Sequence, residues 1–200
     1  MSGFTGLGKN EALEAIKAVA KYVGGFSQSS EVSLTGQVST EELKLASGHG
    51  LSVGDLIMFT TLTGGKTGAN PLFVGRPYFV IVSNAEGIKI SQKESGTAEV
   101  WAETVTAGKY VKLTELSGGS PTYARVGTSF GTASKGKLED VTGHALNVKA
   151  GATISHIGYF QNSSGTPTVG VFTLAAPEAF SEQGTYTVAS ATFDDSLTIA

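Results

Sequence analysis

The sequence contains no cysteine, and this absence excludes disulfide bonds and thiolate metal sites. Charged residues are sparse at 16%, and the net charge of −3 leaves no basic field that would hold a nucleic acid. No apolar run approaches the roughly 20 residues that span a bilayer, and residues 1–13 lack the basic-then-apolar order of a signal peptide. We therefore expect a soluble protein, made and retained inside a cell, that neither inserts into a membrane nor contacts nucleic acid directly.

Short runs of alternating apolar and polar residues fill the last third of the sequence, separated by Gly, Asn, Ser and Pro turns. This period-2 pattern is typical of half-buried antiparallel strands in a sandwich or barrel. The 27 glycines of the chain suit the many tight turns that such a fold needs. The residues that share a strand face are Ala124, Val126, Thr128 and Phe130; Ile154, His156, Gly158 and Phe160; Val169, Val171 and Thr173; Tyr186 and Val188; and Phe193, Leu197 and Ile199.

One helix is predicted from Asn10 to Val23, where good helix formers place an apolar stripe on one side. Asn10 is the expected N-terminal cap. Gly24 or Gly25 is the expected left-handed stop at the C-terminus. A helix of about 14 residues is marginal alone, so its stripe should pack on a sheet of its own domain or on a neighbouring subunit. We expect the former.

Polar breaks at residues 27–30 and 117–121 enclose a segment of different character, which predicts an inserted module of short strands. The strands expected there are Val32–Leu34, Glu42–Leu45, Leu56–Thr60, Tyr78–Val82, Gly87–Ser91, Glu99–Trp101 and Tyr110–Leu113. The predicted fold is mainly β: a jelly-roll-like antiparallel β-sandwich with one N-terminal α-helix and a second small inserted β module. Residues 1–30 (helix and first strand) and 120–200 would form the sandwich, and residues 31–119 the insert.

Two motifs match catalytic loops by letter only. Gly50–Gly54 has the G-x-S-x-G spacing of a nucleophile elbow, but residues 55–62 read as a strand where that motif needs a helix. Thr63–Thr67 ends like a phosphate-binding loop, but Thr60 stands where its first glycine would be. We interpret both as glycine-rich turns.

The titratable residues do not form a recognisable catalytic or metal-binding pattern. His49, His144 and His156 lack ligand spacing; we expect the first two in turns and His156 in the core or at an interface. Neighbours on a strand point to opposite faces, so the pairs Glu139-Asp140 and Asp194-Asp195 are interpreted as solvated turn residues. The sequon Asn162-Ser163-Ser164 is interpreted as a hairpin turn. No catalytic, cofactor-binding or metal-binding residue is predicted, and no cofactor.

Aromatic residues in the middle segment allow a second hypothesis. Trp101, Tyr78, Phe79 and Phe73 would either fill the core of the insert or, if exposed, stack on a sugar ring or a protein partner. The only acidic cluster near these aromatics is Glu94, Glu99 and Glu103, from which an enzyme acting on a polysaccharide would need a convergent carboxylate pair. We expect a structural or a binding role rather than enzymatic activity.

Two parts of the chain resemble a bacteriophage virion-protein family, the tail-fibre or minor tail proteins. The first is the helix ALEAIKAVAKYVGGF at residues 12–26, which leads into a tyrosine-containing strand. The second begins at the Tyr123-Ala-Arg-Val strand and continues through GTSFGTASKGKLED, NVKAGATISHIGYFQNSSG, VGVFTLAAPEAF and GTYTVASATF. Together they cover about 100 of the 200 residues. The middle segment is similar to small β inserts of phage head and tail proteins and departs from the shortest members of the family.

The resemblance implies a non-enzymatic virion structural protein, assembled in the cytoplasm of a bacterial host. Its expected partners are copies of itself, as a trimer, and other virion proteins such as a tail or major capsid protein. A tail or fibre position and a capsid decoration position both remain open. The alternative is a carbohydrate- or host-receptor-binding β module, whose partner would be a host-surface glycan.

Overall fold

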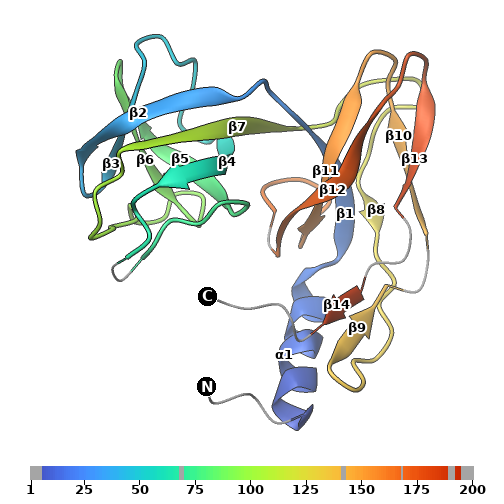
Figure 1. Cartoon of the computed structure of the whole chain (residues 1–200). Helices are drawn as coiled ribbons and strands as arrows, with labels where there is room; N and C mark the ends of the chain where they lie inside the picture. Colours follow the sequence, from blue (N-terminus) through green and yellow to red (C-terminus); the bar gives the residue numbers. More distant parts are fainter. Residues whose placement is uncertain (1–5, 68–69, 141–142, 168, 189–191, 195–200) are drawn as a thin grey trace. The chain divides into compact units, whose positions relative to one another are not determined.

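The computed structural model describes residues 6–67, 70–140, 143–167, 169–188 and 192–194 (Figure 1). Within these residues the protein is mainly β with a single N-terminal helix and antiparallel pairing between its strands, so the predicted fold class is confirmed. The elements are α1 (Gly6–Val19), β1 (Tyr22–Gln28), β2 (Val32–Ser39), β3 (Glu42–Leu45), β4 (Leu56–Thr63), β5 (Pro77–Ser83), β6 (Gly87–Ser91), β7 (Ala107–Glu115), β8 (Val126–Gly127), β9 (Lys137–Glu139), β10 (His144–Val148), β11 (Thr153–Phe160), β12 (Gly170–Ala179), β13 (Gly184–Val188) and β14 (Thr192–Asp194).

The chain divides into two compact units. The first, which we call the terminal unit, comprises residues 1–26 and 115–200. The second, the barrel unit, comprises residues 27–114. The sequence placed these boundaries at residues 30/31 and 119/120, a few residues further along the chain in both cases.

The barrel unit is a closed sheet of six strands. Its strands follow the order β7-β2-β3-β6-β5-β4, and pairing between β4 and β7 closes the ring. Sequence neighbours pair at β2–β3, β4–β5 and β5–β6, whereas β3 pairs with β6 and not with β4. Alternate side chains point into this ring. Its interior is filled by fully buried side chains, the largest being Trp101, Tyr78, Tyr110 and Phe59.

One strand predicted for this unit is wrong. Glu99–Trp101 is an irregular segment and not a strand. Its backbone makes isolated hydrogen bonds to two different segments: Glu99 N donates to Ile90 O at 2.8 Å, and Trp101 N donates to Thr40 O at 3.1 Å. The indole Nε1 of Trp101 donates to Gln37 Oε1 at 2.6 Å, and Val105 N donates to the same oxygen at 2.8 Å. The segment therefore anchors a buried side chain rather than extending a ladder.

The terminal unit is built around strand β11. β11 pairs with β1 on one side and β12 on the other, and β8 adds two residues to β1. Two further pairs, β10–β13 and β9–β14, complete the described strands. A single apolar core joins α1 to these strands through Leu13, Val23, Leu138, Leu146, Val148, Ile157, Tyr159, Val188 and Phe193.

The helix differs from its prediction at both ends. It runs from Gly6 to Val19, so Asn10 lies inside it and not at its cap, and Gly24 and Gly25 lie within β1 rather than at a helix stop. Neither glycine has a positive φ. The polar side chains of the helix contact the segment before β9: Asn10 Oδ1 accepts from Gly136 N at 3.0 Å, Glu14 Oε1 from Ala133 N at 2.6 Å, and Lys17 Nζ donates to Gly131 O at 2.9 Å. α1 therefore packs on its own unit, as expected.

The alternating runs of the last third have mixed outcomes. β11, β12 and β13 confirm three of the predicted strands. The run from Ala124 to Phe130 is regular strand only at Val126–Gly127. Ile154 and His156 were predicted to share one face of the strand, but a register shift lies between them. Ile154 packs against Gly25, whose cross-strand partner is Ile157, so Ile154 lies on the face of Ile157 and not on that of His156. Leu197 and Ile199 lie outside the described residues.

Candidate functional site

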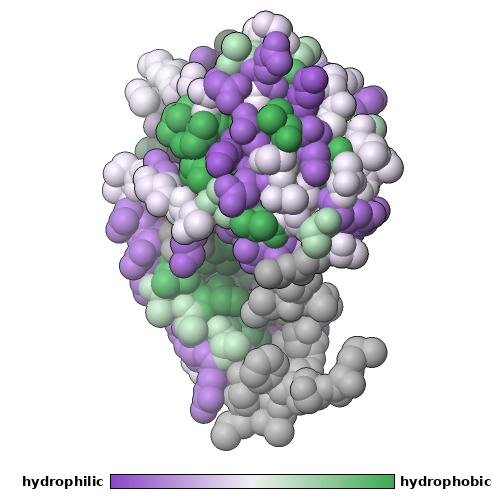
Figure 2. Space-filling model, turned by 90° about the vertical axis from the view of Figure 1, so that its left-hand side faces the viewer, coloured by the Kyte–Doolittle hydropathy of each residue, from purple (hydrophilic) through white to green (hydrophobic). Residues whose placement is uncertain are grey.

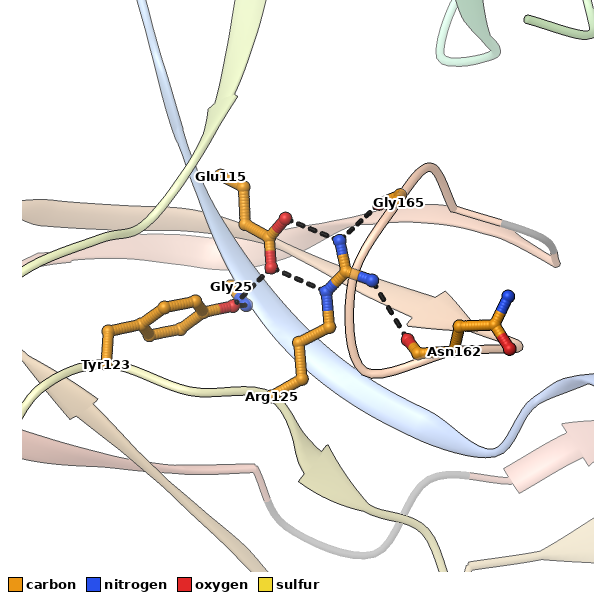
Figure 3. A network of polar contacts seen from close by, with 6 residues as sticks. All are labelled: Gly25, Glu115, Tyr123, Arg125, Asn162 and Gly165. Atoms are coloured by element: carbon orange, nitrogen blue, oxygen red, sulfur yellow. Dashed lines mark hydrogen bonds and ion pairs between the residues drawn. The ribbon is translucent and has the colours of Figure 1, made fainter.

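The densest polar cluster of the terminal unit surrounds Arg125, just before β8 (Figure 3). Its guanidinium binds Glu115 with two bonds, Nε to Oε1 at 2.7 Å and Nη2 to Oε2 at 2.6 Å. Nη1 donates to the carbonyl oxygen of Asn162 at 2.9 Å, and Nη2 also donates to the carbonyl oxygen of Gly165. Two-bond arginine–carboxylate pairs are among the stronger polar contacts in proteins. Four of the five N–H donors of Arg125 are thus used inside the unit.

The Arg125 side chain is only 3% exposed, whereas that of Glu115 is 28% exposed. The guanidinium also lies over the ring of Phe160, with Cζ 3.4 Å from the ring centroid. A planar cation can stack on an aromatic face while its edge donates hydrogen bonds. Arg125 therefore links the end of β7, the end of β11 and the loop of residues 161–165 that follows β11.

Tyr123 completes the cluster from the other side. Its hydroxyl accepts a hydrogen bond from Gly25 N at 3.0 Å and donates one to Glu115 Oε1 at 3.0 Å. Burial, with the negative charge of Glu115 as the second cause, raises the pKa of the Tyr123 phenol far above its ordinary value. Tyr123 therefore stays protonated as the donor, and Figure 3 shows it and Arg125 approaching Glu115 from opposite sides.

The floor of this cluster is a pair of glycines. Gly24 on β1 faces Gly158 on β11, and the rings of Phe26 and Phe160 stack at 5.8 Å between centroids. A Cβ atom on Gly158 would lie 2.6 Å from a ring carbon of Phe26. Aromatic rings covering glycines on neighbouring strands recover the packing that glycine lacks. The cluster is thus a stack of Arg125, Phe160 and Phe26 on a flat two-glycine surface.

A second polar pair is buried near the segment that precedes β10. His144 Nε2 lies 2.6 Å from Asp140 Oδ2, and both residues are at most 3% exposed. Asp140 Oδ1 also accepts a hydrogen bond from Ser129 N at 3.1 Å. The structure therefore corrects two interpretations: His144 lies at the start of a strand and not in a turn, and Asp140 is buried and not solvated.

The buried position of His144, though not its pairing with Asp140, could have been found from the sequence. His144 alternates with Leu146 and Val148, and all three are buried on β10. That spacing is the ordinary signal of a strand face. A carboxylate within reach of a buried histidine then satisfies a polar group that would otherwise be costly. Glu139, by contrast, is exposed as predicted, but it lies at the end of strand β9 and not in a turn. Asp194 likewise ends strand β14, so the turn interpretation is wrong for it too, while its side chain and the whole of Asp195 lie outside the described residues.

The two motif-like loops are turns. Gly54 precedes β4, so a strand and not a helix follows the Gly50–Gly54 sequence. Thr63 ends β4, and the described residues 70–76 after Thr67 form no helix. His49 lies in a turn, as predicted: its Nδ1 accepts from Leu51 N at 3.1 Å and its Nε2 lies 2.9 Å from Asn84 O. The sequon residues lie in the loop between the paired strands β11 and β12, which confirms a hairpin connection.

The acidic residues near the aromatics of the barrel unit act separately. Glu99 is buried and its Oε1 accepts from Gln92 N at 3.1 Å. Glu103 Oε2 accepts from Lys66 N at 3.0 Å, and Glu94 is exposed. Within the described residues no group of three or more His, Cys, Asp or Glu side chains could hold a metal ion. These carboxylates shape loops at the ends of the barrel.

Trp101, Tyr78 and Phe79 belong to the buried core, which confirms the core interpretation for these three aromatics. Phe73 is half-buried, with the guanidinium of Arg76 5.0 Å from its ring centroid. The large hydrophobic side chains that the barrel unit does expose are valines: Val38, Val53, Val74, Val82 and Val100. In the upper part of the face in Figure 2, hydrophobic residues form small groups separated by polar ones.

Comparison of the chain with family models, curated proteins and solved structures finds no match. None of the helical residues that the structure describes forms a span long and apolar enough to cross a membrane. The site must therefore be interpreted from its own geometry. Both polar clusters hold backbone segments of the terminal unit in place, Arg125 for residues 161–165 and Asp140 for the segment around Ser129.

Proposed function

We propose that the protein is a non-enzymatic structural component of a bacteriophage particle, displayed as a tail or fibre component or as a capsid decoration protein. The family resemblance supports a virion role. In the part of the chain that carries it, Tyr123 and Arg125 are the Y-x-R residues of that resemblance, and they lie just before β8. Two compact β units joined at residues 26/27 and 114/115 suit a protein that attaches with one unit and displays the other.

One observation carries the proposal: the buried polar side chains that could act in catalysis are hydrogen-bonded to other groups of the terminal unit. Arg125 is shared among Glu115, Asn162 and Gly165, and His144 is paired with Asp140 at 2.6 Å. Buried, hydrogen-bonded polar groups of this kind specify one arrangement of loops and strands more than they supply reactivity. A protein that serves as scaffold uses its polar groups in this way.

Strand β12 is the surface through which we propose that copies assemble. Among the described strands it lies at the edge of its sheet, and its residues from Phe172 to Ala179 are mostly exposed. Only Gly170–Thr173 and Glu178–Ala179 pair with β11, so the residues between them leave the ladder. Phe172 is 38% exposed although it packs edge-on against Tyr159 and Phe193. An exposed apolar edge is a surface that proteins usually cover, and a symmetric oligomer, expected to be a trimer, covers it with a second copy.

The test is co-purification with the virus that encodes the chain. Particles are purified through a density gradient, and the chain is quantified by mass spectrometry against the major capsid protein. We expect a fixed ratio in every particle-containing fraction and release only under conditions that dissociate the particle. A chain that stays in the soluble fraction of the infected cell contradicts the proposal.

A glycan array with the purified protein distinguishes the structural role from the alternative, a carbohydrate-binding module. Saturable binding that a free sugar competes away, without association with the particle, would favour a carbohydrate-binding module. Tight association with the particle and no glycan binding supports the structural role alone. Because Trp101 and Tyr78 are fully buried, any sugar bound by the barrel unit would have to use other side chains.

A further inference from the structure

His156 is the one fully buried histidine of the described residues that has no charged partner. It lies on β11 at 0% exposure, opposite Phe26 on β1 and Thr173 on β12. His144, by comparison, is paired with Asp140, and His49 lies in a turn. Each of the three histidines therefore has a different environment, and only His156 combines complete burial with neutral cross-strand neighbours.

The hydrogen bonds around His156 select its tautomer. Ser155 Oγ lies 2.8 Å from His156 Nδ1 and 3.2 Å from the carbonyl oxygen of Phe26. A carbonyl oxygen only accepts, so the single hydroxyl proton of Ser155 must point to Phe26. The Ser155 oxygen then accepts from Nδ1–H. The result is a directed chain in which His156 Nδ1–H donates to Ser155, and Ser155 donates to Phe26.

This tautomer leaves Nε2 as a bare acceptor. Among the described residues Nε2 is buried without a hydrogen-bond partner. A lone pair without a donor is tolerable, whereas an N–H⁺ at the same place would be a buried charge without an acceptor. The arrangement is therefore stable only while His156 is neutral.

Among the described residues, the two strands that pair with β11 place no ionised side chain opposite His156. The neighbouring strands present Phe26 and Thr173, and the nearest acidic residue on β12, Glu178, is opposite Ile154, beyond the register shift. Glu115 and Arg125 bind each other on the far side of Phe160. Consistently, burial is the only cause that lowers the pKa of His156.

The chain of hydrogen bonds ends at a position where the fold changes. Phe26 is the last residue of the first segment of the terminal unit, and Ser27 begins the barrel unit. The Ser155–Phe26 bond, the Gly25–Leu116 backbone bond at 2.9 Å and the Phe26–Phe160 stack hold the end of β1 at this point. Whatever releases Phe26 loosens the segment through which the chain leaves the terminal unit.

We propose that His156, Ser155 and Phe26 form an acid-sensitive latch. With His156 neutral, the hydrogen-bond chain holds the end of β1 against β11. Uptake of one proton at Nε2 places a charge in a site without an acceptor, and the end of β1 separates from β11 to let water reach it. The latch is independent of where the protein sits on a particle.

The sign of the effect follows from linkage. An unfolded or opened chain takes up the proton near the ordinary histidine pKa of about 6.5, and the closed form takes it up only at lower pH. The opened form thus binds more protons below about pH 6.5, and acid favours it. The equilibrium constant for closing should fall by up to about tenfold for each pH unit between those two pKa values.

Histidine-ring NMR on the whole chain tests the latch directly. Long-range ¹⁵N–¹H spectra report tautomer and protonation for each of the three histidines from pH 8 to pH 4. We expect His156 as the Nδ1–H tautomer, still neutral at a pH where an exposed histidine is charged, with amide exchange at Gly25 and Phe26 accelerating as pH falls. An Nε2–H tautomer, or titration near pH 6.5 in the folded protein, overturns the proposal.

A variant series gives the second measurement. His156→Asn keeps a donor for Ser155 but cannot titrate, and His49→Asn is the control at a half-buried turn away from β11. Between pH 7 and pH 5 the amide exchange of β1 should stay constant in His156→Asn and rise in both wild type and His49→Asn. An unchanged rise in His156→Asn contradicts the latch. If His156→Asn does not fold, the tautomer and titration of the wild-type ring decide the question.

Discussion

Gly24 and Gly158 are cross-strand partners on β1 and β11, and the absence of both side chains lets two aromatic rings close over the strands. Phe26 and Phe160 stack nearly parallel, with an interplanar angle of 12°. Arg125 lies over the second ring and reaches from there to Glu115 and to residues 161–165. The glycine pair therefore supports the main polar cluster of the terminal unit.

Gly158→Ala tests this support. The new methyl group would lie 2.6 Å from a ring carbon of Phe26, so the stack must shift. We expect a loss of about 1–3 kcal/mol in the free energy of unfolding, the usual cost of overpacking a core, measured by urea denaturation. Gly127→Ala is the control, because a Cβ there meets nothing within 4 Å. Equal effects of the two substitutions would contradict close packing at Gly158.

Arg125→Met should destabilise the terminal unit more than the loss of an exposed ion pair would. The substitution leaves two backbone carbonyls without their donor and Glu115 with only the Tyr123 hydroxyl. We expect a loss of about 2–4 kcal/mol in the free energy of unfolding, since breaking a buried pair costs more than breaking an exposed one. Arg125→Lys keeps the charge but not the two-bond geometry, so its loss should be smaller but clear.

The control for Arg125 is Lys109→Met in the barrel unit. Lys109 pairs with Glu31 at 3.0 Å, with the two side chains 51% and 43% exposed. Exposed pairs contribute about 0–1 kcal/mol. A loss at Arg125 no larger than that at Lys109, measured by chemical denaturation, would show that the cluster in Figure 3 does not hold the unit together.

Asp140→Ala should be far more damaging than a change at its neighbour. It leaves buried His144 and Ser129 N without their acceptor, and a loss of about 3–5 kcal/mol is expected for a broken buried pair. Glu139→Gln changes an exposed side chain and should alter the free energy of unfolding by less than about 0.5 kcal/mol. Asp140→Asn retains hydrogen-bonding atoms at both positions, so its loss in the free energy of unfolding should lie between those of Asp140→Ala and Glu139→Gln. The three variants are compared by thermal unfolding. Equal destabilisation by Asp140→Ala and Glu139→Gln would contradict the pairing of Asp140 with His144.

The proposed assembly surface predicts that a charge on β12 prevents oligomer formation. Ala175 is exposed, so Ala175→Lys should leave folding intact while placing an ammonium group where a second copy would bury it. Native mass spectrometry should detect a trimer for the wild type and a monomer for Ala175→Lys. Ala12→Lys, on the exposed side of α1, is the matched control and should remain trimeric. If Ala12→Lys alone is monomeric, the copies meet through the helix and the β12 surface is wrong.

The sequence predicted most strands where alternation and turn residues coincide. β3 and β6 begin and end at the predicted residues, because glycine or polar turns bound them on both sides. Gly24 and Gly25 misled the helix prediction, since glycine serves equally as a helix stop and as a place where side chains of other strands approach. Only the distant partners Gly158 and Ile154 decide between those uses.

The site was less predictable for the same reason. Arg125 meets Glu115 ten positions earlier but also residues 162 and 165, and the stacking surface comes from β1 and β11. Asp140 appeared to be a turn residue because nothing local indicates that its carboxylate faces a strand beginning at His144. Burial of charge depends on long-range packing, and short-range patterns do not report it.

The most direct test of the proposed virion role is a cryo-EM reconstruction of the intact bacteriophage particle to which we propose that this chain belongs. We predict density for both β units at symmetric positions on the tail or capsid, with β12 covered by a neighbouring copy. A reconstruction in which every protein is assigned and this chain is absent, with the chain recovered instead as a free monomer in the host, would contradict it.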